Sequence, residues 1–401
     1  MSDHKELPLG EFVSLMAMLT SLVALSIDAM LPALSDIGRE LGVQRQNDNQ
    51  LIISALFLGV ALGQLVYGPL SDRIGRKPGI YAGLTLFILG CLLSSISWNY
   101  SVMLCGRFLQ GFGAAGPRII TMALIRDRCK GRAMARITSF VVTIFVIVPT
   151  VAPALGQAVL LVAHWRMIFG LLLALSIITF VWFGIRQPES LPPSRRTPLA
   201  LGTMTKAVKE VCFNRTALGY ALAAGLVFGA FLGYLNSAQQ IFQIQFDLGG
   251  LFPIYFGVLS ASFGAASYTN ARLVMRYGMR TLSWRSLQAL CVLSAVFFTF
   301  SVMIQGQPPL WTVMLWGATT FFCLGMVFGN FNAMAMEPFG QRTGLAAAII
   351  GSFTTLTAGA LGGLIGQLYD GTVLPLIGGF AVLGAGALGA MYWTELVPQG
   401  R

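Results

Sequence analysis

Residues 50–79 read QLIISALFLGVALGQLVYGPLSDRIGRKPG, an apolar run that passes directly into a loop rich in glycine and charge. The run from 50 to 70 contains no charged residue, and a helix of about 20 apolar residues is long enough to cross a bilayer. The loop that follows contains four charged residues, which are Asp72, Arg73, Arg76 and Lys77. The stretch therefore predicts a membrane span that ends at a charged surface loop.

The rest of the chain repeats this pattern. Of its 401 residues, 56% are apolar and only 10% are charged, whereas a soluble domain has about 25% charged residues. Apolar runs of span length occur near 12–34, 50–70, 79–97, 100–122, 138–161, 167–185, 217–238, 251–270, 283–304, 310–334, 343–367 and 373–394. These features exclude a soluble protein and predict an all-α integral membrane protein with about twelve transmembrane helices. The first run has no cleavable signal pattern before it, so we expect this span to be retained.

The net charge of +11 follows from the distribution of basic residues among the loops. If the loops alternate between the two sides of the membrane, most lysines and arginines lie on one side. Only Arg39, Arg45 and Arg166 lie in loops of the other side. This asymmetry is the positive-inside rule, which places both termini in the cytoplasm. Topology thus accounts for the basic charge, and we expect no nucleic-acid partner.

A polar stretch at 187–214 divides the spans six and six. We therefore predict an N-terminal six-helix bundle at 1–186, a cytoplasmic linker at 187–214 and a C-terminal six-helix bundle at 215–401. The halves also show a weak repeat, because GPLSDRIGRKPG follows the second span and ARLVMRYGMRTL follows the eighth, with Gly75 aligned to Gly278. Two related halves around a central cavity are a recurrent transporter plan.

Asp28 lies within the apolar stretch LVALSIDAMLPAL at 22–34. A charged group at such a depth is costly unless it faces a cavity or a partner, and intramembrane carboxylates often mark proton pathways. Arg107 lies at a similar depth in the fourth span, about 9 Å from its outer end. We therefore predict that Asp28 and Arg107 form an ion pair and that proton binding to Asp28 releases Arg107. The alternative is an aspartate in a water-filled vestibule with no role in coupling.

Several further side chains are candidates to line the cavity. Gln110 lies one turn beyond Arg107 on the same helical face. Other polar groups on spans expected to be central are Gln64, Asn236, Gln239 and Asn332. Arg118 is either a second cavity or gate cation, or an arginine that snorkels to the inner interface. With abundant phenylalanine and methionine, such a cavity suits small, mostly lipophilic cargo.

Enzyme and pump chemistries lack their motifs. The six cysteines form no CxxC pair, and the two histidines, His4 and His164, lie outside the spans. We find no nucleophile elbow and no Walker loop. We therefore expect no enzymatic activity, no cofactor and no metal site.

Four motifs resemble those of the major facilitator superfamily and, more narrowly, of its bicyclomycin and chloramphenicol resistance type of drug:proton antiporters. They are GPLSDRIGRKP at 68–78, RFLQGFGAAGP at 107–117 with RD at 126–127, VPTVAPALGQ at 148–157 and IDAMLPAL at 27–34. Three positions depart from the pattern of this group. Met30 stands where the group has a tyrosine, Ser35 lies near the position of a second proline, and Gln157 replaces a glycine. Because Met30 is expected to face the substrate, these departures bear on substrate identity.

The resemblance implies the fold of the superfamily and proton-coupled export across the bacterial inner membrane by a chain that functions as a monomer. It makes Arg107 the functional arginine of the fourth helix. It also implies that the 68–78 loop is a conformational latch, and the residues concerned are Gly68, Asp72, Arg73, Gly75 and Arg76. A loop that is only a positive-inside anchor is the alternative.

Pro149, Pro153 and Gly156 resemble the fifth-helix antiporter motif, which implies an exporter that limits proton leak. From the residues alone, the two prolines are expected to interrupt and bend the fifth helix. Two other functions share parts of the sequence pattern. One is a proton-coupled importer of a small nutrient with the same fold, and the other is a passive channel.

Overall fold

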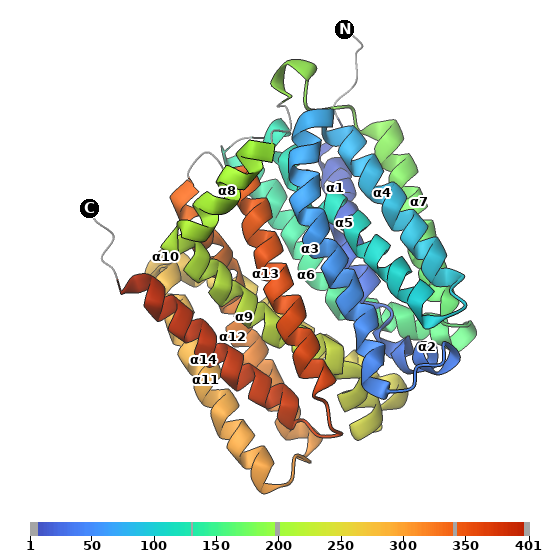
Figure 1. Ribbon diagram of the computed structural model, residues 1–401, viewed down its shortest axis with the longest axis vertical. Coiled ribbons are helices and arrows are strands. Elements are labelled where there is room, and N and C mark those ends of the chain that lie inside the picture. The colour runs from blue at the N-terminus through green and yellow to red at the C-terminus, as the bar shows by residue number, and fades with distance from the viewer. Residues whose placement is uncertain (1–6, 130, 197–200, 340–342, 397–401) are drawn as a thin grey trace. The chain divides into compact units, whose positions relative to one another are not determined.

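The computed structural model describes residues 7–129, 131–196, 201–339 and 343–396 and is almost entirely helical, with no strand among these residues (Figure 1). Within these described ranges, 12 helical segments are long and apolar enough to cross a membrane. They are Leu9–Glu40, Gln46–Ile74, Arg76–Ser95, Tyr100–Arg128, Arg136–Val162, Arg166–Arg186, Arg215–Gln245, Gly249–Tyr277, Met279–Met303, Leu310–Phe339, Gly344–Gln367 and Leu374–Glu395. The predicted all-α class and the number of spans are confirmed.

The chain forms two compact units, and the first comprises Met1–Val43 and Ala55–Thr203. Its helices are α1 (Leu9–Asp28), α2 (Leu34–Glu40), α3 (Leu51–Ile74), α4 (Arg76–Ser95), α5 (Tyr100–Arg128), α6 (Gly131–Val162) and α7 (Arg166–Arg186). Short 3₁₀ turns lie at Leu31–Ala33 and Pro193–Arg195.

The second unit comprises Gln44–Ser54 and Met204–Arg401. Its helices are α8 (Leu201–Phe213), α9 (Arg215–Gln239), α10 (Phe252–Tyr277), α11 (Met279–Met303), α12 (Leu310–Met336), α13 (Thr343–Gln367) and α14 (Leu374–Glu395). A π-helical turn, Gln240–Gln245, extends α9, and 3₁₀ turns lie at Gln46–Gln50, Gly249–Leu251 and Glu337–Phe339.

The two units repeat one packing scheme. In the first unit, α1 packs against α5, α6 and α7, while α4 packs against α5 and α7 (Figure 1). In the second unit, α9 packs against α12, α13 and α14, while α11 packs against α12 and α14. Helices in corresponding sequence positions therefore make corresponding contacts, so the two units share the internal repeat that the sequence predicts.

Glycines allow α4 and α5 to approach each other closely. A Cβ atom at Gly83 would lie 2.8 Å from the carbonyl oxygen of Gly113, and one at Gly113 would overlap the backbone of Phe87. The same contact recurs two turns away, where Gly90 of α4 faces Gly106 of α5. A Cβ atom at Gly90 would likewise lie 2.8 Å from the carbonyl oxygen of Gly106. Such small-residue contacts stabilise helix pairs in lipid, where no hydrophobic force drives helices together.

Residues 44–54 belong to the second unit because amide side chains attach them to it. The Asn47 side chain donates to the carbonyl oxygens of Gln367 and Tyr369, at 3.0 and 2.8 Å. Gln367 Nε2 donates in return to the carbonyl oxygen of Asn47, at 2.9 Å. Gln240 bridges the side chains of Asn47 and Gln50. The division into units therefore falls within α3, between Ser54 and Ala55.

The α4–α5 contact predicts a position-dependent effect of alanine. Gly113→Ala should lower the free energy of unfolding by about 1–3 kcal/mol, because the added methyl group forces two backbones apart. Gly389→Ala in α14 should be neutral or stabilising, because a Cβ atom there meets nothing within 4 Å and alanine favours the helix. Thermal unfolding of the two purified variants tests this, and equal destabilisation would contradict the packing.

Candidate functional site

Asp28 is the last residue of α1, and its side chain is 3% exposed. The helix ends here because the chain turns through Met30 into a 3₁₀ turn that contains Pro32. Proline has no N–H and disfavours helical geometry at the preceding residue. The helix that the sequence predicts through 12–34 is therefore broken. The apolar segment continues through α2, which places Asp28 deeper than the sequence indicated.

Two features of this position oppose a negative charge on Asp28. The carboxyl group is buried, and an unpaired buried charge is costly. It also lies at the C-terminal end of α1, where the helix dipole is negative and disfavours an anion.

Gly156 packs α6 directly against the end of α1. A Cβ atom at Gly156 would overlap the carbonyl oxygen of Ala29, the residue after Asp28. The glycine of the fifth-helix motif therefore lets the α6 backbone touch the backbone beside the buried carboxyl group. The predicted interruption of this helix is wrong, because α6 runs without a break from Gly131 to Val162 through Pro149 and Pro153. Membrane helices tolerate prolines where neighbouring groups satisfy the freed carbonyls.

Arg107 is fully buried within α5 of the same unit. Its Nη1 donates to Gln110 Oε1 at 2.6 Å, and Gln110 Nε2 donates to Cys91 Sγ of α4 at 2.9 Å. The guanidinium also lies over the ring of Phe169, 5.8 Å from the centroid. Among the described residues, the predicted ion pair between Arg107 and Asp28 is not formed. Arg107 is instead oriented by Gln110, one turn along its own helix.

The other candidate cavity residues are distributed over both units. Met30 and Gln110 are fully buried, and Gln64, Asn236 and Gln239 are at most 7% exposed. Gln239 Nε2 donates to Gln243 Oε1 at 2.9 Å, and Asn332 Nδ2 bonds to its own helix at the carbonyl oxygen of Phe328, 3.0 Å away. Their common exposure to a substrate cavity stays a prediction. Arg118 lies over the ring of Phe145, 5.7 Å from the centroid.

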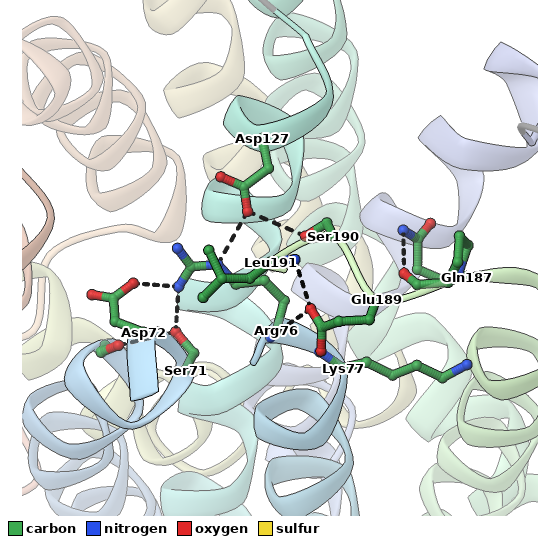
Figure 2. Close-up of polar contacts among 11 residues, drawn as sticks. Ser71, Asp72, Arg76, Lys77, Asp127, Gln187, Glu189, Ser190 and Leu191 are labelled. Atoms are coloured by element: carbon green, nitrogen blue, oxygen red, sulfur yellow. Dashed lines mark hydrogen bonds and ion pairs between the residues drawn. The ribbon is translucent and has the colours of Figure 1, made fainter. Parts of the chain in front are cut away.

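The 68–77 loop, the part of the 68–78 motif that ends at Lys77, contains a group of polar and ionic contacts centred on Arg76 (Figure 2). Arg76 is 5% exposed, and its Nη1 contacts Asp72 Oδ1 at 2.5 Å and Ser71 Oγ at 2.8 Å. Its Nε reaches Asp127 Oδ2, in the last turn of α5, at 3.1 Å. Arg76 therefore ties the end of α3 and the start of α4 to the end of α5.

Three other members of the predicted latch differ in their surroundings. Gly75 caps α4 with a φ of +110°, which favours glycine. Gly68 makes no turn, because it lies inside the continuous helix α3. Arg73 is exposed, and the basic partner of Asp72 is Arg76.

The second unit contains a related loop at the aligned position. Gly278 caps α11 with a φ of +78°, as Gly75 caps α4. Arg280 pairs with Glu337 directly after α12 at 3.1 Å, as Arg76 pairs with Asp127 at the end of α5. No aspartate corresponds to Asp72, because Val274 and Met275 occupy the aligned region.

The Major Facilitator Superfamily profile matches residues 16–367. The chain belongs to this superfamily. An "Uncharacterized MFS-type transporter YdgK" of Bacillus subtilis (strain 168) is 30% identical over 368 residues, 90% of each chain. "Multidrug resistance protein D" of Escherichia coli (strain K12) is 28% identical over 371 residues, 89% of each chain. A "Bicyclomycin resistance protein homolog" of Haemophilus influenzae is 26% identical over 369 residues, 91% of each chain. The resemblance seen in the sequence motifs is confirmed.

Solved structures of the superfamily share the fold. The xylose transporter XylE from E. coli matches with a TM-score of 0.75 at 12% identity, over 98% of this chain and 99% of that one. The human organic anion transporter MFSD10 (TETRAN) matches with a TM-score of 0.72 at 16% identity, over 97% and 100%. The chain is thus a multi-pass membrane transporter of the superfamily.

The sequence did not predict two acidic residues that contact the 68–77 loop, Asp127 and Glu189. Asp127 is part of the RD pair in the fourth-helix motif, but its partner Arg76 lies 51 positions earlier. Glu189 lies in the stretch predicted to be a linker, yet it contacts Arg76 and Lys77, more than 100 positions away. The only signal in the sequence was an acidic residue immediately after the sixth span.

The two histidines were not candidate site residues. His164 forms an ion pair with Glu40 at 2.7 Å if it is protonated, and His4 lies outside the described residues.

The two arginines of the loop should differ in their effect on stability. Arg76→Ala should lower the free energy of unfolding by about 1–3 kcal/mol, because it removes the guanidinium that donates to Asp72, Asp127 and Ser71. Arg73→Ala should change it by less than about 0.5 kcal/mol, because the side chain is exposed. Thermal unfolding in detergent measures both, and an equal loss would contradict the assignment of Arg76 as the central cation.

The α1–α6 contact makes a second prediction. Gly156→Ala should reduce transport severely or unfold the unit, because its methyl group overlaps the Ala29 carbonyl. Gly170→Ala in α7 is the matched control, since the nearest atoms to a Cβ atom there are 3.8 Å away. Expression, thermal stability and transport are compared in the two variants. Normal transport by Gly156→Ala would contradict the close approach.

Proposed function

We propose that this superfamily transporter is a proton-coupled antiporter that exports small, mostly lipophilic compounds across the cytoplasmic membrane of a bacterium. The proposal includes alternating access, cytoplasmic termini, and action as a monomer without a nucleic-acid partner. The observation that carries it is the buried carboxyl group of Asp28 at a helix end against which the fifth-helix motif packs.

Asp28 is suited to exchange a proton in each cycle. Burial and the C-terminal dipole of α1 favour its neutral form, whereas access to water favours its ionised form. A change in access between the two sides can therefore change its protonation state. Arg107 is the second member of the proposed coupling pair, because it brings a positive charge into the same unit and its guanidinium is oriented by Gln110.

Export is supported by the relatives and by the fifth-helix motif. The names of several relatives specify multidrug or bicyclomycin resistance. Pro149, Pro153 and Gly156 occur in the arrangement typical of antiporters, and Gly156 contacts the residue next to Asp28. We propose that Met30, Gln64, Gln110, Asn236, Gln239 and Asn332 contribute to substrate binding.

The 68–77 loop is proposed to act as a latch during the cycle. Its ion pairs join Arg76 to Asp72 and Asp127, which lie at the ends of two different helices. Breaking them costs more than breaking exposed pairs, because the guanidinium is nearly inaccessible to water. A loop of this kind can hold one conformation until substrate or proton binding compensates for that cost.

Asp28→Asn tests the proton-coupling role. The asparagine cannot ionise, so pH-gradient-driven efflux of drugs and dyes from inverted vesicles should fall by at least about tenfold, while substrate binding persists. Asp36→Asn is the matched control, because Asp36 is exposed on α2 of the same span.

Two outcomes would contradict the proposal. Unchanged proton-driven export by Asp28→Asn would remove the coupling role of this carboxyl group. Proton-driven uptake of a nutrient into right-side-out vesicles, with no export of any tested compound, would favour the importer. Growth with toxic compounds and growth on a single nutrient distinguish these two functions in cells.

A further inference from the structure

The first turn of α4 lacks the usual means of satisfying its backbone. The first N–H groups of a helix have no partner within the helix, and an N-cap side chain often accepts one of them. Gly75 is the N-cap of α4 and has no side chain, while Pro78 has no N–H group. The N–H of Gly79 bonds to the carbonyl oxygen of Gly75 at 3.3 Å. Two donors of the first turn remain, the N–H groups of Arg76 and Lys77.

Glu189 accepts both of these hydrogen bonds. Its Oε1 accepts from the backbone N–H of Arg76 at 3.0 Å, and its Oε2 accepts from that of Lys77 at 3.1 Å (Figure 2). A carboxylate at a helix N-terminus also interacts favourably with the helix dipole. The cap of α4 is thus supplied by a residue 113 positions later in the chain.

The surroundings are shaped to hold this carboxylate. A Cβ atom at Gly75 would lie 2.4 Å from Glu189 Oε2, so a larger residue there would displace the carboxylate from the first turn of α4. Glu189 Oε1 also accepts from the backbone N–H of Leu191 at 2.9 Å. The next residue, Ser190, donates from Oγ to Asp127 Oδ2 at 3.2 Å. The segment after α7 therefore contacts both the start of α4 and an acidic partner of Arg76.

A second contact joins the start of α4 to the end of α7, and here the side chain is a cation and the helix end is negative. Lys77 Nζ donates to the carbonyl oxygen of Gly184, in the last turn of α7, at 2.9 Å. The carboxylate of Glu189 thus lies at the positive end of α4, and the ammonium of Lys77 lies at the negative end of α7. The two helices are tied at this end by a pair of charge–dipole contacts.

We propose that Glu189 is a positioning residue for the latch, because it fixes the backbone of Arg76 and so holds the guanidinium in reach of Asp72 and Asp127. The inference rests on the proposed function of the 68–77 loop and extends it to the segment after the sixth span. Arg76 is held at both ends: its N–H by Glu189, and its guanidinium by the two aspartates. The start of the predicted linker is therefore part of the latch.

Glu189→Gln tests this role with little change in shape. Glutamine removes the charge and points an NH₂ group at one of the N–H donors. Hydrogen exchange of the protein in lipid nanodiscs should show the Arg76 and Lys77 amides exchanging at least about tenfold faster, because their cap is weakened. Proton-driven efflux should fall at least about fivefold in its maximal rate. Glu189→Asp, which keeps the charge, should restore part of both.

Glu210→Gln is the matched control, because it makes the same charge change on an exposed residue of α8. It should leave amide exchange at Arg76 and the rate of efflux unchanged. A double-mutant cycle then distinguishes positioning from general stability. If Glu189 acts through Arg76, the efflux losses of Glu189→Gln and Arg76→Ala are not additive.

The possible outcomes separate this inference from the proposed function. Unchanged amide exchange in Glu189→Gln, or additive losses with Arg76→Ala, would overturn the positioning role. An absence of proton-driven efflux by the wild-type protein would overturn the proposed function, while amide exchange would still decide whether Glu189 caps α4. If Glu189→Gln shows faster exchange at Arg76 and Lys77 but normal efflux, Glu189 caps α4 without being needed by the latch. This result would also overturn the inference.

Discussion

Water is absent from the hydrocarbon core of a bilayer, so every backbone N–H and C=O group there must find a partner inside the protein. This constraint explains why the described chain is almost entirely helical. It also makes the helix ends the places where the chain most needs partners from elsewhere, since each end leaves backbone groups without intrahelical partners. In this transporter, two of those ends coincide with the residues that the sequence motifs single out.

The first is the end of α1 at Asp28. The chain breaks its helix inside an apolar segment, and the break places a carboxyl group where both burial and the helix dipole oppose its charge. The same break exposes the Ala29 backbone to α6, where only a glycine fits. Motifs from the first and fifth spans therefore meet at one backbone contact, although more than 120 positions separate them.

The second is the start of α4 at Gly75. A glycine that turns the chain and a proline that lacks an N–H group leave two donors, and a distant glutamate accepts both. The aligned loop of the second unit shares the capping glycine, and it has an Arg280–Glu337 pair where the first unit has Arg76–Asp127, but it lacks a counterpart of Asp72. The repeat thus preserves the backbone turn, while the ionic contacts differ between the two units.

The sequence by itself determined the membrane-spanning class, the number of spans and the superfamily, because these depend on long apolar runs and on local motifs. It also indicated Asp28, Arg107 and the 68–77 loop. Tertiary structure alone decided that α6 continues through Pro149 and Pro153, that Gly68 makes no turn and that Arg107 binds Gln110 instead of Asp28. It also revealed Glu189 as the cap of α4. These features depend on contacts between residues far apart in the chain, and hydrophobic patterns do not encode which distant donor meets which acceptor.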